Sequence, residues 1–166
     1  MNYVFSKCVA TFMTAFVGVA LPLSINLFIA GGLYPNFVPE RLEWLSIGLL
    51  DRHLFAQIYS RYPALYCVIY IVVDGLFAGA IALTSISIAR IVKSHFTAVV
   101  TPMVVIIVLS IILEQNANQG NWSLLAMLNP IQYETTFWYQ MLTVCILIVV
   151  GNILVIYFMS RKRDVI

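Results

Sequence analysis

Charged residues are scarce in this sequence of 166 residues. Asp, Glu, Lys and Arg together make up 10%, whereas a typical soluble domain has about 25%. Apolar residues make up 62%, and a soluble protein of this size has too much surface for its volume to hide them all. The composition therefore excludes a soluble globular domain and predicts that apolar side chains face a lipid bilayer. The net charge of +2, without a clustered basic face, gives no basis for a nucleic-acid partner.

Sequence motifs of catalysis and cofactor binding are also missing. The chain has no GxxxxGK(S/T) loop for nucleotide phosphates, no HExxH and no GxSxG. Its three cysteines, Cys8, Cys67 and Cys145, are odd in number and lie in apolar runs without CxxC spacing. The histidines His53 and His95 are expected on opposite sides of the membrane, where they could not share a metal. We therefore expect no metal, no cofactor and no enzymatic activity.

Four long apolar runs dominate the chain, at residues 8–30, 64–89, 97–113 and 136–159. A helix of about 20 residues crosses a hydrocarbon core of roughly 30 Å. Lipid offers the backbone no hydrogen-bond partners, so a spanning segment must pair its own N–H and C=O groups as a helix. The runs predict an all-α fold, a polytopic membrane protein with four transmembrane helices in a single transmembrane domain over residues 1–166.

Proline and glycine residues mark the expected bends and ends of these helices. Pro22 lies within the first run, and its missing N–H predicts a kink there. Gly31 and Gly32 are expected to end the same helix. Pro63 suits the first position of the second helix, where no N–H is needed.

Two connecting segments have a mixed character. Residues 40–60 alternate charged side chains with apolar ones, and Asp51 could cap a short helix that runs to Tyr59. Residues 122–129 form an apolar piece that is too short to span a bilayer. Segments of this kind lie in the membrane interface with their apolar side toward the lipid. Both are predicted to contain short interfacial helices on the outer side.

Positive charges are unevenly divided between the two sides that four spans create. Six lie on the side of both termini and three on the other, and an excess of Lys and Arg is typical of cytoplasmic loops. We therefore predict a multi-pass protein of the cell (plasma) membrane with both termini in the cytoplasm. The six are Lys7, Arg90, Lys93, Arg161, Lys162 and Arg163, and the three are Arg41, Arg52 and Arg61.

Asp74 is the one charged residue in the second predicted span. An ionised Asp at the bilayer centre costs about 2.5–3.5 kcal/mol on insertion scales, and such residues usually face protein or a water-filled path. On a helical wheel it shares a side with Gly75 and Gly79, whose GxxxG spacing lets another helix approach closely. Two interpretations stay open: contact with a proton or substrate, or a protonated or hydrogen-bonded group that fixes packing. Thr143 and Asn152 are the candidate partners of such a group.

Other polar residues also lie within the spans. Each is most simply a helix–helix hydrogen bond, which contributes less than about 2 kcal/mol in a membrane. The candidate residues are Asp74, Asn26 and Asn152 for a substrate path or for packing, and Gly75, Gly79 and Pro22 for helix packing.

Several local patterns follow one another along the chain in a familiar order. In that order they resemble the membrane subunits of ATP-binding-cassette exporters of the type 2 permease family, in particular a bacterial branch of it. The patterns are Tyr3–Lys7 with an apolar run to Asn26, Tyr59–Tyr66 at the entry to the second span, Asp74–Gly79 within it, Asn129–Pro130, and the basic tail Arg161–Asp164.

The resemblance implies that the four spans match the third to sixth of the family's usual six. The first two spans are then missing, together with the coupling helix between them that contacts the ATPase. It also implies a separate ATP-binding subunit as partner, and assembly as a homodimer or with a second permease chain. No catalytic residue is implied, because the chemistry belongs to the ATPase.

Two functions therefore stay open from the sequence. The first is a permease component of an ATP-binding-cassette exporter, which forms part of the translocation path. The alternative is a small non-transport membrane protein, an immunity or accessory factor, that binds another membrane protein through the Gly75 and Gly79 face. The first predicts an ATPase partner, and the second predicts a stable partner of another kind.

Overall fold

The computed structural model describes residues 2–33, 55–92, 94–115, 122, 124–128 and 137–163. Every regular element in this part of the chain is an α-helix, as the composition predicts. The helices are α1 (Asn2–Leu33), α3 (Ala56–Arg61), α4 (Pro63–Ile91), α5 (His95–Gln115), α6 (Leu124–Leu128) and α7 (Trp138–Arg163).

Three of these helices are long and apolar enough to cross a membrane. The segments are Phe5–Leu33 of α1, Pro63–Ile91 of α4 and Trp138–Phe158 of α7. They confirm a multi-pass helical membrane protein. The third predicted span, 97–113, falls in α5, whose apolar segment Phe96–Ile112 is shorter than the other three. That α5 also crosses the bilayer stays a prediction.

The ends of the helices differ from the predicted ends in one instructive place. α1 runs through both Gly31 and Gly32 to Leu33 instead of ending at them. Glycine costs a helix about 1 kcal/mol per residue relative to alanine, but a helix broken in lipid loses backbone hydrogen bonds that nothing else replaces. Pro63, by contrast, is the first residue of α4 as predicted, with Tyr62 as the residue before the helix.

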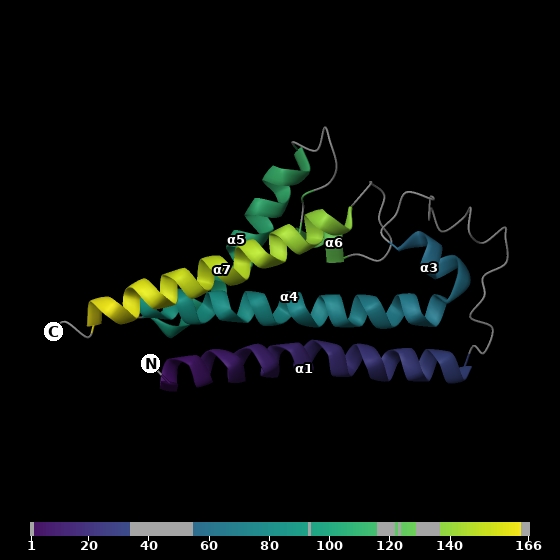
Figure 1. The fold of residues 1–166 in the computed structure, drawn as a ribbon, viewed down its shortest axis with the longest axis horizontal. Coiled ribbons are helices and arrows are strands. Elements are labelled where there is room, and N and C mark those ends of the chain that lie inside the picture. Colours follow the sequence, from purple (N-terminus) through teal and green to yellow (C-terminus); the bar gives the residue numbers. More distant parts are fainter. Residues whose placement is uncertain are drawn as a thin grey trace.

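α4 is the central helix of the described structure. Figure 1 shows α1 running beside it in the opposite direction, α7 packed on it, and α5 diverging from it. α1 packs on α4 alone among the described elements, whereas α4 also contacts α3, α5, α6 and α7. The first turn of α1 and the last turn of α7 lie at the same end of the molecule (Figure 1).

The buried core lies where α4, α6 and α7 meet. Phe77, Met127 and Met141 are its buried members, one from each helix. Phe55 packs against this cluster and has a left-handed backbone with φ of 61°, an unusual conformation for a bulky residue that tertiary packing must maintain. The core is small, because lipid covers most of the remaining apolar surface.

The two predicted interfacial segments are described only in part. α3 begins within the predicted segment 40–60, and α6 lies within the predicted segment 122–129. α3 begins at Ala56 and ends at Arg61, beyond the predicted end at Tyr59. Residues 40–54, including the predicted cap Asp51, lie outside the described residues, as does Asn129.

Candidate functional site

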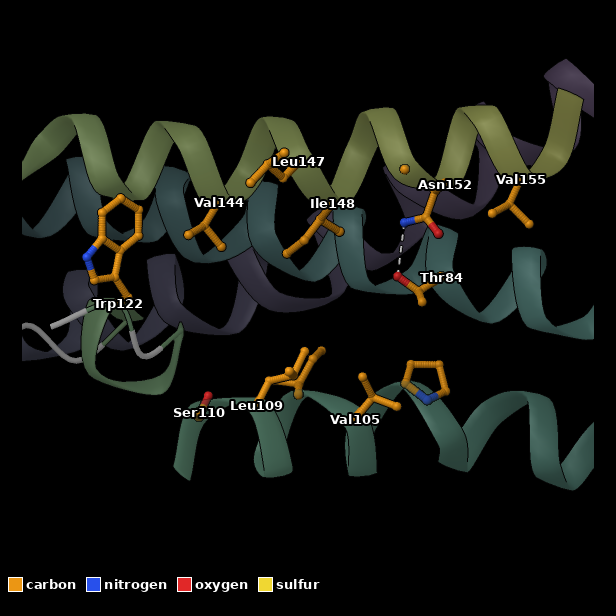
Figure 2. Close-up of a pocket in the computed structure, with 13 residues that line it drawn as sticks. Thr84, Val105, Leu109, Ser110, Trp122, Val144, Leu147, Ile148, Asn152 and Val155 are labelled. Atoms are coloured by element: carbon orange, nitrogen blue, oxygen red, sulfur yellow. Dashed lines mark hydrogen bonds between the residues drawn. The ribbon is translucent and has the colours of Figure 1, made fainter. Parts of the chain in front are cut away.

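Asn152 joins α7 to α4 by side-chain hydrogen bonds. Its amide nitrogen Nδ2 donates to Thr84 Oγ1 at 3.0 Å (Figure 2) and to the carbonyl oxygen of Ala80 at 3.4 Å. The Ser87 hydroxyl donates to Asn152 Oδ1 at 2.9 Å. Ala80, Thr84 and Ser87 share one face of α4 because a helix repeats every three to four residues. At an average of about 0.6 kcal/mol per bond in a membrane, the three bonds contribute about 2 kcal/mol.

The glycines of the predicted GxxxG face lie against α1. A Cβ atom built on Gly75 would stand 2.8 Å from the Phe16 ring, and one on Gly79 would stand 2.6 Å from the Phe12 ring. Both distances are too short for any side chain, so the aromatic rings occupy the space that the absent side chains leave. The close approach that the spacing predicts is thus made by a helix of the same chain.

Asp74 lies next to this contact and is half-buried. Its carboxylate oxygen Oδ1 is enclosed and has no hydrogen-bond partner among the described residues. The two candidate partners are elsewhere. Thr143 donates to the carbonyl oxygen of Tyr139 in its own helix, and Asn152 binds at Thr84, ten residues or roughly 15 Å along α4 from Asp74.

A row of tyrosine rings leads along α3 and α4 to Asp74. The ring centroids of Tyr59 and Tyr66 are 5.1 Å apart, and those of Tyr66 and Tyr70 are 4.8 Å apart. Tyr66, Tyr70 and Asp74 follow one another at a spacing of four residues, so they lie on neighbouring turns of one face. That spacing is visible in the sequence, and it is the signal by which this row could have been found.

Asn26 and Pro22 lie on an exposed part of α1. Phe12 and Phe16 of α1 face Gly79 and Gly75 of α4, so Asn26 is ten residues or roughly 15 Å along α1 from the level of Asp74. The structure therefore places Asp74, Asn26 and Asn152 in three separate surroundings. It does not bring them together into one site.

A cavity of about 350 Å³ lies between α5 and α7, and sequence reasoning gave no sign of it. Figure 2 shows α5 along one side and α7 along the other, with Trp122 at one end and Asn152 and Thr84 near the other. Its walls are mainly aliphatic. The residues that line it are Thr84, Pro102, Val105, Ile106, Leu109, Ser110, Trp122, Val144, Leu147, Ile148, Gly151, Asn152 and Val155.

Ser110 is the polar residue of this cavity whose bonding is incomplete. It is 2% exposed, and its hydroxyl oxygen has no hydrogen-bond partner within the described structure. A buried hydroxyl without a partner loses its hydrogen bonds to water and gains none in return. Thr84 and Asn152, in contrast, are bonded to each other.

Groups that bind metals are dispersed over the described part of the chain. Nowhere in it do three His, Cys, Asp or Glu side chains come together. Cys8, Cys67 and Cys145 are free thiols on three different helices.

Comparison with known proteins gives no relative for this chain. No protein-family model matches the sequence, no curated protein is similar to it, and no solved structure matches its fold.

Proposed function

We propose that this chain is a permease component of an ATP-binding-cassette exporter, which forms part of a translocation path across the cell membrane. The observation that carries the proposal is Asp74, an acidic residue within the central helix whose carboxylate oxygen Oδ1 is enclosed and unpartnered among the described residues. A buried carboxylate oxygen that served only packing would be expected to have a hydrogen-bond partner, because an unpaired polar atom at membrane depth costs several kcal/mol. The order of elements that resembles the type 2 permease family supports the same proposal.

In this proposal a separate ATPase subunit supplies the energy, and the membrane helices supply the path. Asp74 contacts the substrate or a proton when the helices move. In the proposal α1 hinges at Pro22, which supplies no backbone N–H to the helix and is exposed rather than packed on α4. A second copy of the chain or another permease chain completes the path, and both termini lie in the cytoplasm.

The alternative was an accessory factor that binds a partner through Gly75 and Gly79. Those glycines already lie against Phe16 and Phe12 of α1 in the same chain. A partner helix could use this face only by displacing α1. The geometry therefore favours the permease proposal over this form of the alternative.

The decisive experiment is purification of the tagged chain from its own cells in mild detergent, followed by mass spectrometry of the proteins that accompany it. The permease proposal predicts an ATPase with a phosphate-binding loop in stoichiometric amount. A folded, abundant chain that purifies with a different membrane protein and without an ATPase would contradict the proposal and support the accessory role.

The variant Asp74→Asn distinguishes a functional role of the Asp74 carboxyl group from a structural role. The substitution keeps the shape and removes the charge, so we expect unchanged membrane abundance and thermal stability but failure to complement the phenotype of a deletion strain. Abundance measured by immunoblot serves as the control, with Asn26→Leu as the removal of a polar group at an exposed site of α1. Loss of abundance equal to the loss of complementation would show that Asp74 maintains packing instead.

A further inference from the structure

The cavity between α5 and α7 is built as a slot rather than as a packing defect. Both helices pack on α4, but their backbones do not contact each other within the described structure. On α5 the lining residues run from Pro102 to Ser110, which is eight residues or roughly 12 Å along the helix. A space of about 350 Å³ with that length suits an extended chain better than a compact ring system.

The walls of this slot select an apolar occupant. Val105, Leu109, Leu147 and Ile148 present aliphatic side chains to it, with Val144 and Val155 beside them. Walls of this kind favour an apolar occupant, since a water between them would lack hydrogen-bond partners. The polar atoms of Thr84 and Asn152 are joined to each other and do not call for a ligand.

An unused hydrogen-bond donor lies at the end of the slot opposite to Thr84 and Asn152. Ser110 is 2% exposed, its hydroxyl has no partner among the described residues, and Figure 2 shows it on the cavity side of α5. Ser110 lies three residues, or about 5 Å, before Leu113, where the predicted span 97–113 ends. Trp122 lines the same end, and tryptophan is enriched at membrane–water interfaces.

The aliphatic walls match the hydrocarbon part of an acyl chain, and Ser110 matches its carbonyl group. We propose that the slot between α5 and α7 binds an acyl chain whose carbonyl oxygen accepts a hydrogen bond from the Ser110 hydroxyl. The carbonyl group then lies at the level of the membrane interface, and the hydrocarbon runs along Leu109 and Val105 toward the bilayer interior. The same chemistry occurs in a membrane phospholipid and in a free fatty acid. The site does not depend on the permease proposal, because an acyl chain can bind whether or not an ATPase is present.

The test uses the full-length protein in phosphatidylcholine vesicles that contain a small fraction of phosphatidylcholine with a diazirine in its acyl chain. After irradiation, mass spectrometry maps the labelled residues. We expect label on Leu109 and Leu147 well above that on Ile25 and Val17 of α1, which are about as exposed but do not line this cavity. A second arm replaces the lipid probe with a diazirine fatty acid. Label in the slot from the fatty acid alone identifies a free fatty acid as the source, and label from phosphatidylcholine identifies a membrane lipid.

Two variants make the test specific. Gly151 lines the slot, and a Cβ atom there meets nothing within 4 Å, so Gly151→Phe fills the slot without a clash at its first atom. It should reduce labelling of Leu109 to the level of α1, whereas Gly18→Phe, at an equally open site on α1, should leave it unchanged. Ser110→Ala, which removes only the hydroxyl, should lower occupancy at limiting probe by about five-fold, as expected for one hydrogen bond.

The outcome that overturns the proposal is equally concrete. Slot labelling no higher than that of α1 with both probes would show ordinary lipid contact instead of a site. Labelling that persists unchanged in both Gly151→Phe and Ser110→Ala would contradict it as well. If Gly151→Phe does not fold, Ser110→Ala alone still tests whether labelling of Leu109 depends on the slot.

Discussion

The two long contacts of α4 are built in different ways. Toward α1, Gly75 and Gly79 omit their side chains so that Phe16 and Phe12 can lie against the backbone. Toward α7, Asn152 forms three hydrogen bonds, and Phe77 and Met141 fill a small core. One interface depends on shape and the other on polar complementarity and bulk.

The difference shows how helices associate when the solvent is lipid. Apolar surface gains little by leaving lipid for another apolar surface, so close packing and hydrogen bonds must supply the association energy. α1 has no buried residue in its apolar segment and relies on close packing alone at its glycine contacts, whereas α4 is the most enclosed of the three long helices. We therefore expect the two interfaces to fail under different substitutions.

The largest effect is expected from Gly79→Leu. The first added atom already comes within 2.6 Å of Phe12, so α1 must shift or separate from α4. Overpacking of this kind costs about 1–3 kcal/mol, sometimes more, and we expect a value near the upper end. Thermal unfolding in detergent measures it, with Gly18→Leu, where the added group meets open space, as the control.

A second substitution tests whether the destabilisation by Gly79→Leu comes from the contact with Phe12. Phe12→Ala removes the ring that the new side chain would strike, so the double variant should regain part of the lost stability. Destabilisation that simply adds up in the double variant would contradict the contact between Gly79 and Phe12.

A smaller effect is expected from Asn152→Leu. The variant removes all three hydrogen bonds between α7 and α4, at an expected cost of about 2 kcal/mol. Thr84 and Ser87 are not left unpaired. Thr84 donates to the carbonyl oxygen of Ala80 at 3.3 Å, and the Ser87 hydroxyl, released from Asn152, can donate its proton to the carbonyl oxygen of Leu83 at 3.2 Å. Asn26→Leu, at an exposed amide in α1, is the matched control in the same unfolding assay. Equal losses from the two substitutions would refute a special role of Asn152.

The smallest effect is expected from Ser87→Ala. Only the 2.9 Å bond to Asn152 Oδ1 is lost between the helices, which amounts to about 0.6 kcal/mol. Because Asn152 keeps its bonds to Thr84 and Ala80, the α4–α7 contact should persist. In an Asn152→Leu background the further loss should be close to zero, and a full second loss would mean that Ser87 acts elsewhere.

Sequence reasoning located the helices because hydropathy and backbone pairing in lipid are local properties. It placed Pro63 correctly at the start of α4, and it singled out the close approach at Gly75 and Gly79. It was wrong at Gly31 and Gly32, where the cost of breaking a helix in lipid exceeds the glycine penalty.

Relations between helices were beyond the reach of the sequence. Whether Asn152 meets Asp74 or Thr84 depends on the axial register of α7 on α4, which no single-residue property records. The slot at Ser110 arises because α5 diverges from α7, and the divergence follows from packing on α4. The regular spacing of Tyr66, Tyr70 and Asp74, in contrast, was present in the sequence and was overlooked.

The most direct test of the arrangement around α4 is oxidative cross-linking in native membranes. In a chain with Cys8, Cys67 and Cys145 replaced by alanine, two cysteine pairs are introduced separately. One pair, Phe16→Cys with Gly75→Cys, joins α1 to α4, and the other, Ser87→Cys with Asn152→Cys, joins α4 to α7. The account predicts rapid disulfide formation within one chain for both pairs and none for Gly18→Cys with Gly75→Cys in a Phe16→Ala background, where the ring no longer meets the cysteine at position 75. Failure of the first pair, or its formation only between chains, would contradict the central position of α4.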